Sequence, residues 1–190
     1  MKRTLLAAVV AVATLVGVVG CSDSTEAAPV VPANAPLSME LLAQTASGFT
    51  AGQQMATRTV YVFFDMQCPH CGELWAAAKP LFPNTKFVWV PVGILSRASI
   101  AQGATILTVK DPVAAMDEHE TSLAARRGGM AADSDAMDKL GGKVRANTQL
   151  MSAFKADSVP FIVAKNPQTG ELMTHAGAMS TAELRTFLML

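Results

Sequence analysis

Two runs of hydrophobic residues near the middle of the chain contain few polar positions. Thr59–Phe64 (TVYVFF) and Lys86–Val92 (KFVWVPV) are rich in β-branched and aromatic residues and lack the alternation of a half-exposed strand. Such runs are typical of strands that are buried on both faces. The segment between them, from Cys68 to Lys79, has the length and pattern of a helix. A strand, a helix and a second strand make a βαβ unit, so we predict an α/β fold whose central sheet is flanked by helices.

The stretch from Ser96 to Ala156 is mostly helical in pattern and predicts an insertion of three or four helices, at about residues 96–157. We expect its helices to break at Asp111-Pro112, at Gly128-Gly129 and at Gly141-Gly142. Val159–Lys165 then predicts a strand that begins with a proline, and Leu172–His175 predicts its partner across a turn. The last predicted element is a helix over Thr181–Leu190, with Thr181 as N-cap. Residues 58–190 thus form one predicted domain.

The beginning of the chain has the pattern of an export signal. Met1-Lys2-Arg3 is positively charged, and the following run, Leu5–Val19, is almost entirely apolar but short for a membrane span. Val18-Val19-Gly20-Cys21 resembles the cleavage site of bacterial lipoproteins, in which the cysteine becomes the lipid-carrying N-terminus. We therefore predict a lipoprotein signal at residues 1–20 and lipidation of Cys21. The alternative is an ordinary cleaved signal followed by an incidental cysteine.

A tether is predicted between this signal and the domain. Residues 21–36 are rich in alanine, proline and small polar residues and show no apolar face. Leu37–Thr45 has the spacing of a short helix, and the glycines at 48 and 52 predict a loop or short hairpin up to Arg58. We therefore expect residues 37–57 to be a helix and loop segment that precedes the main domain.

The charge balance excludes one class of partner. The chain has 15 basic and 15 acidic residues, and removal of residues 1–20 takes away Lys2 and Arg3 but no acidic residue. The remaining 13 basic residues do not outnumber the acidic ones, so the domain lacks the positive charge that nucleic-acid binding requires. About 150 residues after the tether are enough for one hydrophobic core and suggest a single domain.

The chemistry is predicted to lie in the motif Cys68-Pro69-His70-Cys71, at the start of the first long helix. Backbone N–H groups and the helix dipole would stabilise a thiolate on Cys68, and His70 would add to that effect. Pro69 suits the first turn, where its missing N–H costs nothing. Cys71 lies one turn further on and can close a disulfide with Cys68. We assign Cys68 as the attacking thiol, Cys71 as the resolving thiol, and Pro69 and His70 as residues that tune them.

Other roles for these cysteines are less consistent with the sequence. If Cys21 carries lipid, two cysteines and three histidines (His70, His119 and His175) remain, without the spacing of a second pair of zinc ligands. A structural disulfide across so short a loop would remove little entropy from the unfolded chain. A copper-binding lipoprotein that uses both cysteines and a histidine stays open as an alternative of another class. We expect no metal and no other cofactor, and we expect His119 and His175 to lie at the surface.

Taken together, three segments resemble the thioredoxin-fold Dsb proteins of the bacterial periplasm: the strand Val60–Asp65, the CPHC motif, and Val159-Pro160 before the late strand. The resemblance implies a thioredoxin-like fold with a helical insertion. It also implies that Pro160 is a cis-proline facing the cysteines, and that the backbone of Val159 pairs with a client peptide. Met66, in the loop beside Cys68, is a further candidate for the client-binding surface.

Along residues 58–190 the resemblance is closer to the isomerase-like DsbG and DsbC branch. Val60–Phe82 looks like the active-site region of those proteins, and Val92–Pro112 like the start of their insertion. Pro-His between the cysteines and Val159 before the proline instead look like the oxidase DsbA. The short span between Cys21 and the first strand leaves no room for a dimerisation domain, so we expect a monomer. Val62 also replaces the buried acid of thioredoxin and DsbA, and the sequence names no proton acceptor for Cys71.

These observations predict a periplasmic thiol–disulfide oxidoreductase that exchanges disulfides with client proteins through a Cys68 mixed disulfide, which Cys71 resolves. Two directions stay open. As an oxidase, the protein would be recharged by a membrane partner of the DsbB type. As a DsbG-like reductase or isomerase, it would be kept reduced by a partner of the DsbD type. A lipid on Cys21 would hold it at a membrane, and Ser22 favours the outer membrane.

Overall fold

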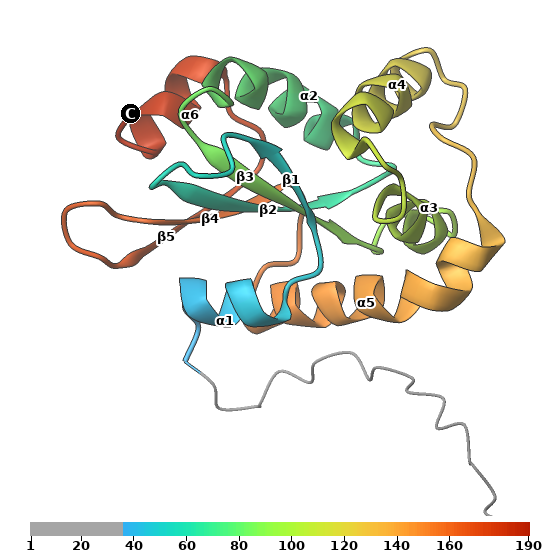
Figure 1. The fold of residues 1–190 in the computed structure, drawn as a ribbon, viewed down its shortest axis with the longest axis horizontal. Coiled ribbons are helices and arrows are strands. Elements are labelled where there is room, and N and C mark those ends of the chain that lie inside the picture. The colour runs from blue at the N-terminus through green and yellow to red at the C-terminus, as the bar shows by residue number, and fades with distance from the viewer. Residues whose placement is uncertain (1–35) are drawn as a thin grey trace, which may run out of the picture.

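The computed structural model describes residues 36–190 of the chain (Figure 1). The predicted signal at residues 1–20, the lipidation site Cys21 and nearly all of the tether lie outside the described residues. The elements follow in the order α1 (Met39–Thr45), β1 (Phe49–Gly52), β2 (Thr59–Asp65), α2 (Pro69–Ala78), the 3₁₀ helix η1 (Lys79–Leu81), β3 (Lys86–Val92), α3 (Ser99–Ile106), α4 (Pro112–Ala124), α5 (Ser134–Ala153), β4 (Phe161–Lys165), β5 (Leu172–Ala176) and α6 (Thr181–Phe187).

The strands form one mixed sheet in the order β1-β3-β2-β4-β5. The two predicted buried strands, β2 and β3, are parallel and lie next to each other at the centre of the sheet, with Val60 opposite Phe87 and Phe64 opposite Pro91. β4 lies antiparallel to β2 on its other side, and β5 extends the sheet beyond β4. The predicted βαβ unit and the late pair of strands are therefore confirmed.

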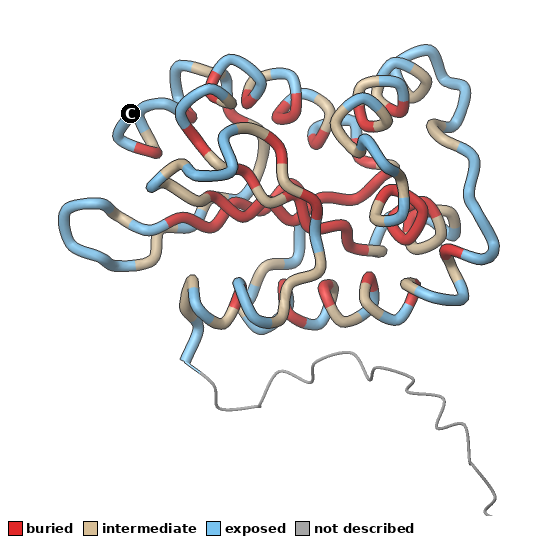
Figure 2. Tube along the Cα trace, in the orientation of Figure 1, coloured by how far each residue is buried: buried red, intermediate tan, exposed pale blue. Residues whose placement is uncertain are grey.

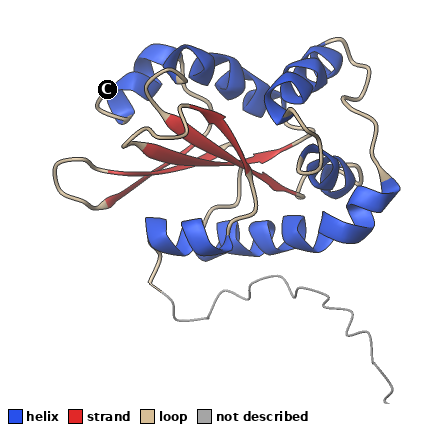
Figure 3. Cartoon of the chain, in the orientation of Figure 1, coloured by secondary structure: helices blue, strands red, loops and turns tan. Residues whose placement is uncertain are grey.

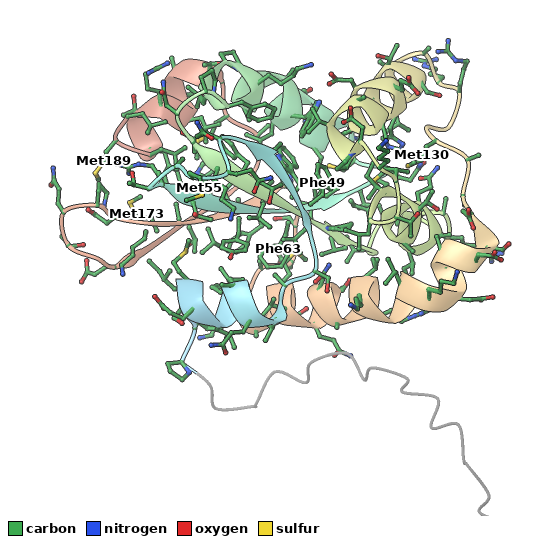
Figure 4. The ribbon with its side chains drawn as sticks, viewed as in Figure 1. Phe49, Met55, Phe63, Met130, Met173 and Met189 are labelled. Atoms are coloured by element: carbon green, nitrogen blue, oxygen red, sulfur yellow. The ribbon has the colours of Figure 1, made fainter. Side chains whose placement is uncertain are left out.

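Helices cover both faces of this sheet, with α2 and α6 on one side and α1 and α5 on the other (Figures 1 and 3). Successive residues of β2 point to opposite faces, as in any strand. Val62 and Phe64 join the cluster beneath α2 and α6, whereas Tyr61 and Phe63 join the cluster above α1 and α5. The buried positions are therefore concentrated in the central strands β2, β3 and β4 (Figure 2), and Phe49 and Phe63 lie on opposite sides of the sheet (Figure 4). This accounts for the lack of alternation in the sequence.

The predicted insertion between β3 and β4 consists of α3, α4 and α5. Asp111 caps α4 through its side chain, and Gly128 and Gly129 lie in the connection to α5 with positive φ. The prediction of a break at Gly141-Gly142 is wrong, because α5 continues through both residues. Two glycines cost only about 2 kcal/mol in a helix, and the burial of the apolar side of α5, which includes Val144 and Leu150, outweighs that cost.

Gly142 is exposed on α5, and a Cβ added there would meet no atom within 4 Å. We expect Gly142→Ala to raise the free energy of unfolding by about 0.5–1 kcal/mol, because alanine loses less backbone entropy in a helix. Urea unfolding measures this change. Gly52→Ala is the contrasting variant, since Gly52 has φ +90° and its Cβ would lie 2.3 Å from the carbonyl oxygen of Thr85. A loss of stability in Gly142→Ala would contradict the prediction.

The segment before β2 belongs to the fold rather than preceding it. The predicted loop or hairpin after α1 contains the edge strand β1, which pairs antiparallel with β3 and buries Phe49 and Ala51. A four-residue strand that contains small residues has too weak a pattern to be found in the sequence, and it is the pairing with β3 that makes this segment a strand.

The N-cap of α6 differs from the prediction, since Ser180 and Glu183 form a capping box in place of the predicted cap at Thr181.

Within residues 36–190, no helix is both long and apolar enough to cross a membrane.

Candidate active site

The CPHC motif lies where strand β2 passes into helix α2. Cys68 is the N-cap of α2, Pro69 is its first residue, and the Cys71 and Gly72 N–H groups donate to the Cys68 carbonyl oxygen over 3.0 and 3.4 Å. The strand-to-helix placement of the motif predicted from the sequence is therefore present. It puts the Cys68 sulfur at the N-terminus of a helix, where the unpaired N–H groups favour negative charge.

The turn before Cys68 is held by a buried carboxylate. Asp65, at the end of β2, is fully buried and accepts four hydrogen bonds. Its Oδ1 accepts from the Gln67 N–H (2.9 Å) and the Ser99 hydroxyl (2.6 Å). Its Oδ2 accepts from the N–H groups of Ile94 (2.8 Å) and Leu95 (3.0 Å). Asp65 thus joins the active-site turn to the loop after β3, a role that its position at the end of a predicted strand did not reveal.

Both cysteines are free thiols with little exposed surface. The pKa of Cys68 is lowered to about 7, mainly because the Cys71 thiol hydrogen-bonds to it; burial opposes this effect, and N–H groups at the start of α2 assist it. The pKa of Cys71 is raised far above its ordinary value, first by burial, then by its hydrogen bond to Cys68 and by the negative charge on Cys68. The pair therefore consists of one thiol that ionises near neutral pH and one that stays protonated.

The charge of His70 contributes less to the lowered pKa of Cys68 than the sequence suggested. Its side chain is exposed, and its Nδ1 lies 2.9 Å from Oε2 of Glu73. Hydrogen bonding to Glu73 raises the pKa of His70, which favours the charged imidazolium. That charge lowers the pKa of Cys68 in the predicted direction, but it is the smallest of the causes.

Val159 and Pro160 approach the motif from the start of β4. Their peptide bond is cis, as the resemblance implied. The Cys68 thiol lies 3.6 Å from the Val159 carbonyl oxygen, within reach of an S–H hydrogen bond. Two segments far apart in the chain thus meet at one sulfur atom.

Met66 is not available to contact a client protein. Its side chain is fully buried in the core, so its predicted place on the binding surface is wrong. The Met66 carbonyl oxygen instead lies 2.6 Å from His119 Nε2, and His119 Nδ1 accepts from the N–H of Met130 over 2.9 Å. These partners make Nε2 the protonated nitrogen, and burial lowers the pKa of His119. His119 is buried, so the expectation that it lies at the surface is also wrong. Its partner Met130 lies beside α4, the helix that carries His119 (Figure 4).

Two glutamines form a further connection that the sequence did not indicate. Gln67, directly before Cys68, donates to Gln102 Oε1 on α3 (2.6 Å) and to the Gly128 carbonyl oxygen (3.1 Å). Gln102 is buried and donates to the Gly128 (2.9 Å) and Met130 (2.8 Å) carbonyl oxygens. These bonds tie the connection between α4 and α5 to the active-site turn, although a glutamine in a helical pattern carries no signal of such a role.

A third residue missed in the sequence is Glu120, on α4. Its Oε1 is buried without a hydrogen-bond partner. Its Oε2 lies 2.2 Å from the place where a Cβ on Gly72 would stand, so the carboxylate rests against the backbone just after Cys71. Burial, and then the charge on Cys68, raise the pKa of Glu120 to about 7. Glu120 and Gly72 also line a pocket of about 540 Å³ between α2 and α4, together with Gln67 and Pro69.

Within residues 36–190, the structure contains no cluster of three or more side chains from histidine, cysteine, aspartate or glutamate that could hold a metal ion.

The chain is similar to named thiol–disulfide proteins. It is 30% identical over 162 residues to the thiol:disulfide interchange protein DsbG of Pseudomonas aeruginosa, a match that covers 81% of this chain and 60% of that relative's length. The chain thus spans less than two thirds of that relative. No protein-family model matches it.

Solved structures show the same fold at low sequence identity. The catalytic domain of Proteus mirabilis ScsC superposes with a TM-score of 0.58 at 17% identity, over 78% of this chain and 90% of that one. The thiol-disulfide exchange protein α-DsbA2 of Wolbachia pipientis superposes with a TM-score of 0.57 at 19% identity, over 74% and 85% of the two chains. The thioredoxin-like fold predicted from the sequence is confirmed.

Proposed function

We propose that this protein, a thioredoxin-fold relative of the Dsb thiol:disulfide interchange proteins, exchanges disulfides with client proteins through Cys68 and Cys71. One observation carries the proposal: a thiol with a pKa of about 7 caps a helix, with a second, buried thiol hydrogen-bonded behind it. A thiol with a pKa near the ambient pH is both sufficiently ionised and sufficiently nucleophilic to attack a disulfide.

The reaction follows from the different states of the two sulfurs. The Cys68 thiolate attacks one sulfur of a client disulfide, and the other client sulfur leaves as a thiolate. The Cys71 sulfur then attacks Cys68, which releases the client and leaves a Cys68–Cys71 disulfide. The same steps in reverse deliver a disulfide to a reduced client. The Val159 carbonyl oxygen, 3.6 Å from the Cys68 sulfur, is placed to pair with the backbone of a client held in extended conformation.

As part of the same proposal, the protein acts in the periplasm, anchored to a membrane, with a membrane redox partner. Residues 1–20 would direct export, and a lipid on Cys21 would hold the domain at the periplasmic side of a membrane, the outer membrane being favoured by Ser22. A partner of the DsbB type would reoxidise the pair, or one of the DsbD type would reduce it. The expectation that the protein is a monomer stays a prediction, which the mass of the purified protein in solution can check.

Two measurements test the proposal. The purified protein is expected to catalyse reduction of insulin by a dithiol and reactivation of scrambled ribonuclease, and Cys68→Ser is expected to do neither. The reduction potential of the Cys68–Cys71 pair, together with its redox state in cells, decides the direction of exchange. A strongly oxidising potential with the disulfide at rest supports an oxidase, and reduced thiols at rest support a reductase or isomerase. Absence of both activities in the intact protein would contradict the proposal.

The ionisation of Cys68 gives a separate prediction. In the reduced protein, the far-ultraviolet absorbance of the thiolate is expected to rise with pH with a midpoint near 7, and Cys68→Ser is expected to lack this transition. Cys71→Ala should move the midpoint to higher pH, because the Cys71 thiol is the largest cause of the lowered pKa. His70→Ala should move it upward by less. A larger effect from His70 than from Cys71 would contradict the order of causes.

A further inference from the structure

Glu120, a half-buried residue of α4 next to the reactive thiol pair, has one carboxyl oxygen that is buried without a hydrogen-bond partner. Among the described residues, three buried side-chain polar atoms have no hydrogen-bond partner, and the one that belongs to an ionisable group is Glu120 Oε1. An unpaired carboxylate away from water is costly unless it is neutral or has a function. The ion pairs of residues 36–190 join His70 to Glu73 and Lys79 to Asp117, so neither compensates Glu120.

The position of Glu120 is set by the active-site helix. A Cβ on Gly72 would lie 2.2 Å from Glu120 Oε2 and 2.9 Å from its carboxyl carbon. A glycine at this position therefore lets a side chain from α4 approach the first turn of α2, directly after Cys71. Glu120 also lines the pocket between α2 and α4, so solvent can reach the side chain although its Oε1 is buried.

The other ionisable side chains near the thiols are already occupied. Asp65 accepts four hydrogen bonds, two at each oxygen. Both nitrogens of His119 are bound to backbone groups. His70 and Glu73 are exposed and pair with each other. Glu120 is therefore the acid in this region whose buried oxygen is free to take up or give a proton.

We propose that Glu120 accepts the proton of Cys71 when Cys71 resolves the mixed disulfide on Cys68, and returns it in the reverse reaction. This inference rests on the proposed function of the two cysteines. Transfer of the proton, directly or through one water molecule, leaves a Cys71 thiolate. That thiolate attacks Cys68, the Cys68–client bond breaks and the client sulfur leaves as a thiolate. A Cys68–Cys71 disulfide forms, so the protein dithiol is oxidised by two electrons while the client disulfide is reduced.

The electrostatics of the three groups agree with this role. The pKa of Cys71 is raised, mainly by burial and in smaller part by its hydrogen bond to Cys68 and by the charges on Cys68 and Glu120. It would therefore ionise too rarely near neutral pH without a base. The pKa of Glu120, raised to about 7, makes it able both to accept and to give a proton in that range. When Cys68 is bound in a mixed disulfide, its negative charge is gone and the pKa of Glu120 falls. A larger fraction of Glu120 is then ionised and can accept the proton of Cys71 at the resolving step.

The test separates the two thiols in time. A chromogenic aromatic disulfide of the dithiobis(nitrobenzoate) type releases one coloured thiolate when Cys68 attacks and a second when Cys71 displaces the first adduct. In Glu120→Gln, we expect the second phase to slow by at least about tenfold at pH 7, while the first phase changes little. The rate of the second phase in the wild-type protein should also titrate with pH, with a midpoint below 7 because the mixed disulfide removes the charge on Cys68 that helps to raise the pKa of Glu120. Glu120→Gln should lose this dependence.

Matched variants exclude a general effect on the fold. Glu118→Gln removes an exposed carboxylate from the same helix and should leave both phases unchanged. Glu120→Asp should restore part of the second phase and its pH dependence, and Gly72→Ala, which displaces Glu120, should slow that phase as well. If the wild-type protein releases both thiolates and Glu120→Gln does so at the same second rate, the Glu120 proposal is wrong and the proposed function stands. A wild-type protein that releases only one thiolate overturns both.

Discussion

Cys71→Ala is expected to accumulate covalent adducts with client proteins and to lose at least about a hundredfold in turnover, because an intramolecular attack is replaced by slow attack from solution. Cys68 remains at the helix N-terminus in this variant and can still attack a disulfide. The resolving sulfur, which is held within hydrogen-bonding reach of Cys68 in the wild-type protein, is gone. The client therefore stays bound.

Non-reducing electrophoresis with mass spectrometry detects these adducts, and insulin reduction measures turnover. Cys68→Ala is the control and should give neither adducts nor turnover. Adducts linked to Cys71 in that control, or full turnover in Cys71→Ala, would reverse the assignment of attacking and resolving sulfur. The alanine also removes the hydrogen bond that favours the Cys68 thiolate, so adducts should form more readily at higher pH.

Asp65→Ala is expected to cost about 3–5 kcal/mol of the free energy of unfolding. The substitution leaves the Ser99 hydroxyl and the N–H groups of Gln67, Ile94 and Leu95 without their acceptor. Each buried donor without a partner costs about 1–3 kcal/mol, partly offset where water can reach it. Because the Ile94 and Leu95 groups lie in the loop after β3, the variant should also loosen the turn that positions Cys68.

Urea unfolding of the reduced protein measures this loss. Asp157→Ala is the matched control, since Asp157 is exposed in the segment before β4, and its replacement should change stability by less than about 0.5 kcal/mol. A loss below about 1 kcal/mol in Asp65→Ala would mean that water replaces the carboxylate as acceptor and that the four hydrogen bonds are not a main support of the turn.

Much of the core was predictable because its signals are local. The β-branched run at Thr59–Phe64 needs burial on both faces whatever surrounds it, and it became the central strand β2. The structure differs from the sequence-based predictions at Gly141-Gly142 and at β1 for a related reason. Helix and strand propensities amount to about 1 kcal/mol per residue, and packing of α5 and pairing of β1 with β3 outweigh them.

In the active site, too, the features set by neighbouring residues were predictable and those set by tertiary packing were not. Cys68 and Cys71 lie in one helical turn, so their spacing alone placed both sulfurs together, and the resemblance implied the approach of Val159-Pro160 from a distant segment. The side-chain direction of Met66 was not determined by its position beside Cys68. The core beneath α2 takes up its side chain, while its carbonyl oxygen bonds to His119, 53 residues further along the chain.

By itself, then, the amino-acid sequence determined the central strands, the helical insertion and a dithiol at a strand-to-helix junction. Those features depend on residues adjacent in the chain and on a free energy that each segment gains by burial almost anywhere. The tertiary structure alone decided what surrounds the dithiol: the four donors on Asp65, the bond between Gln67 and Gln102, and the approach of Glu120 to Gly72. The reason is physical, because a polar side chain carries no periodic signal of its partner, and its state depends on which donors, charges and water the folded chain brings to it.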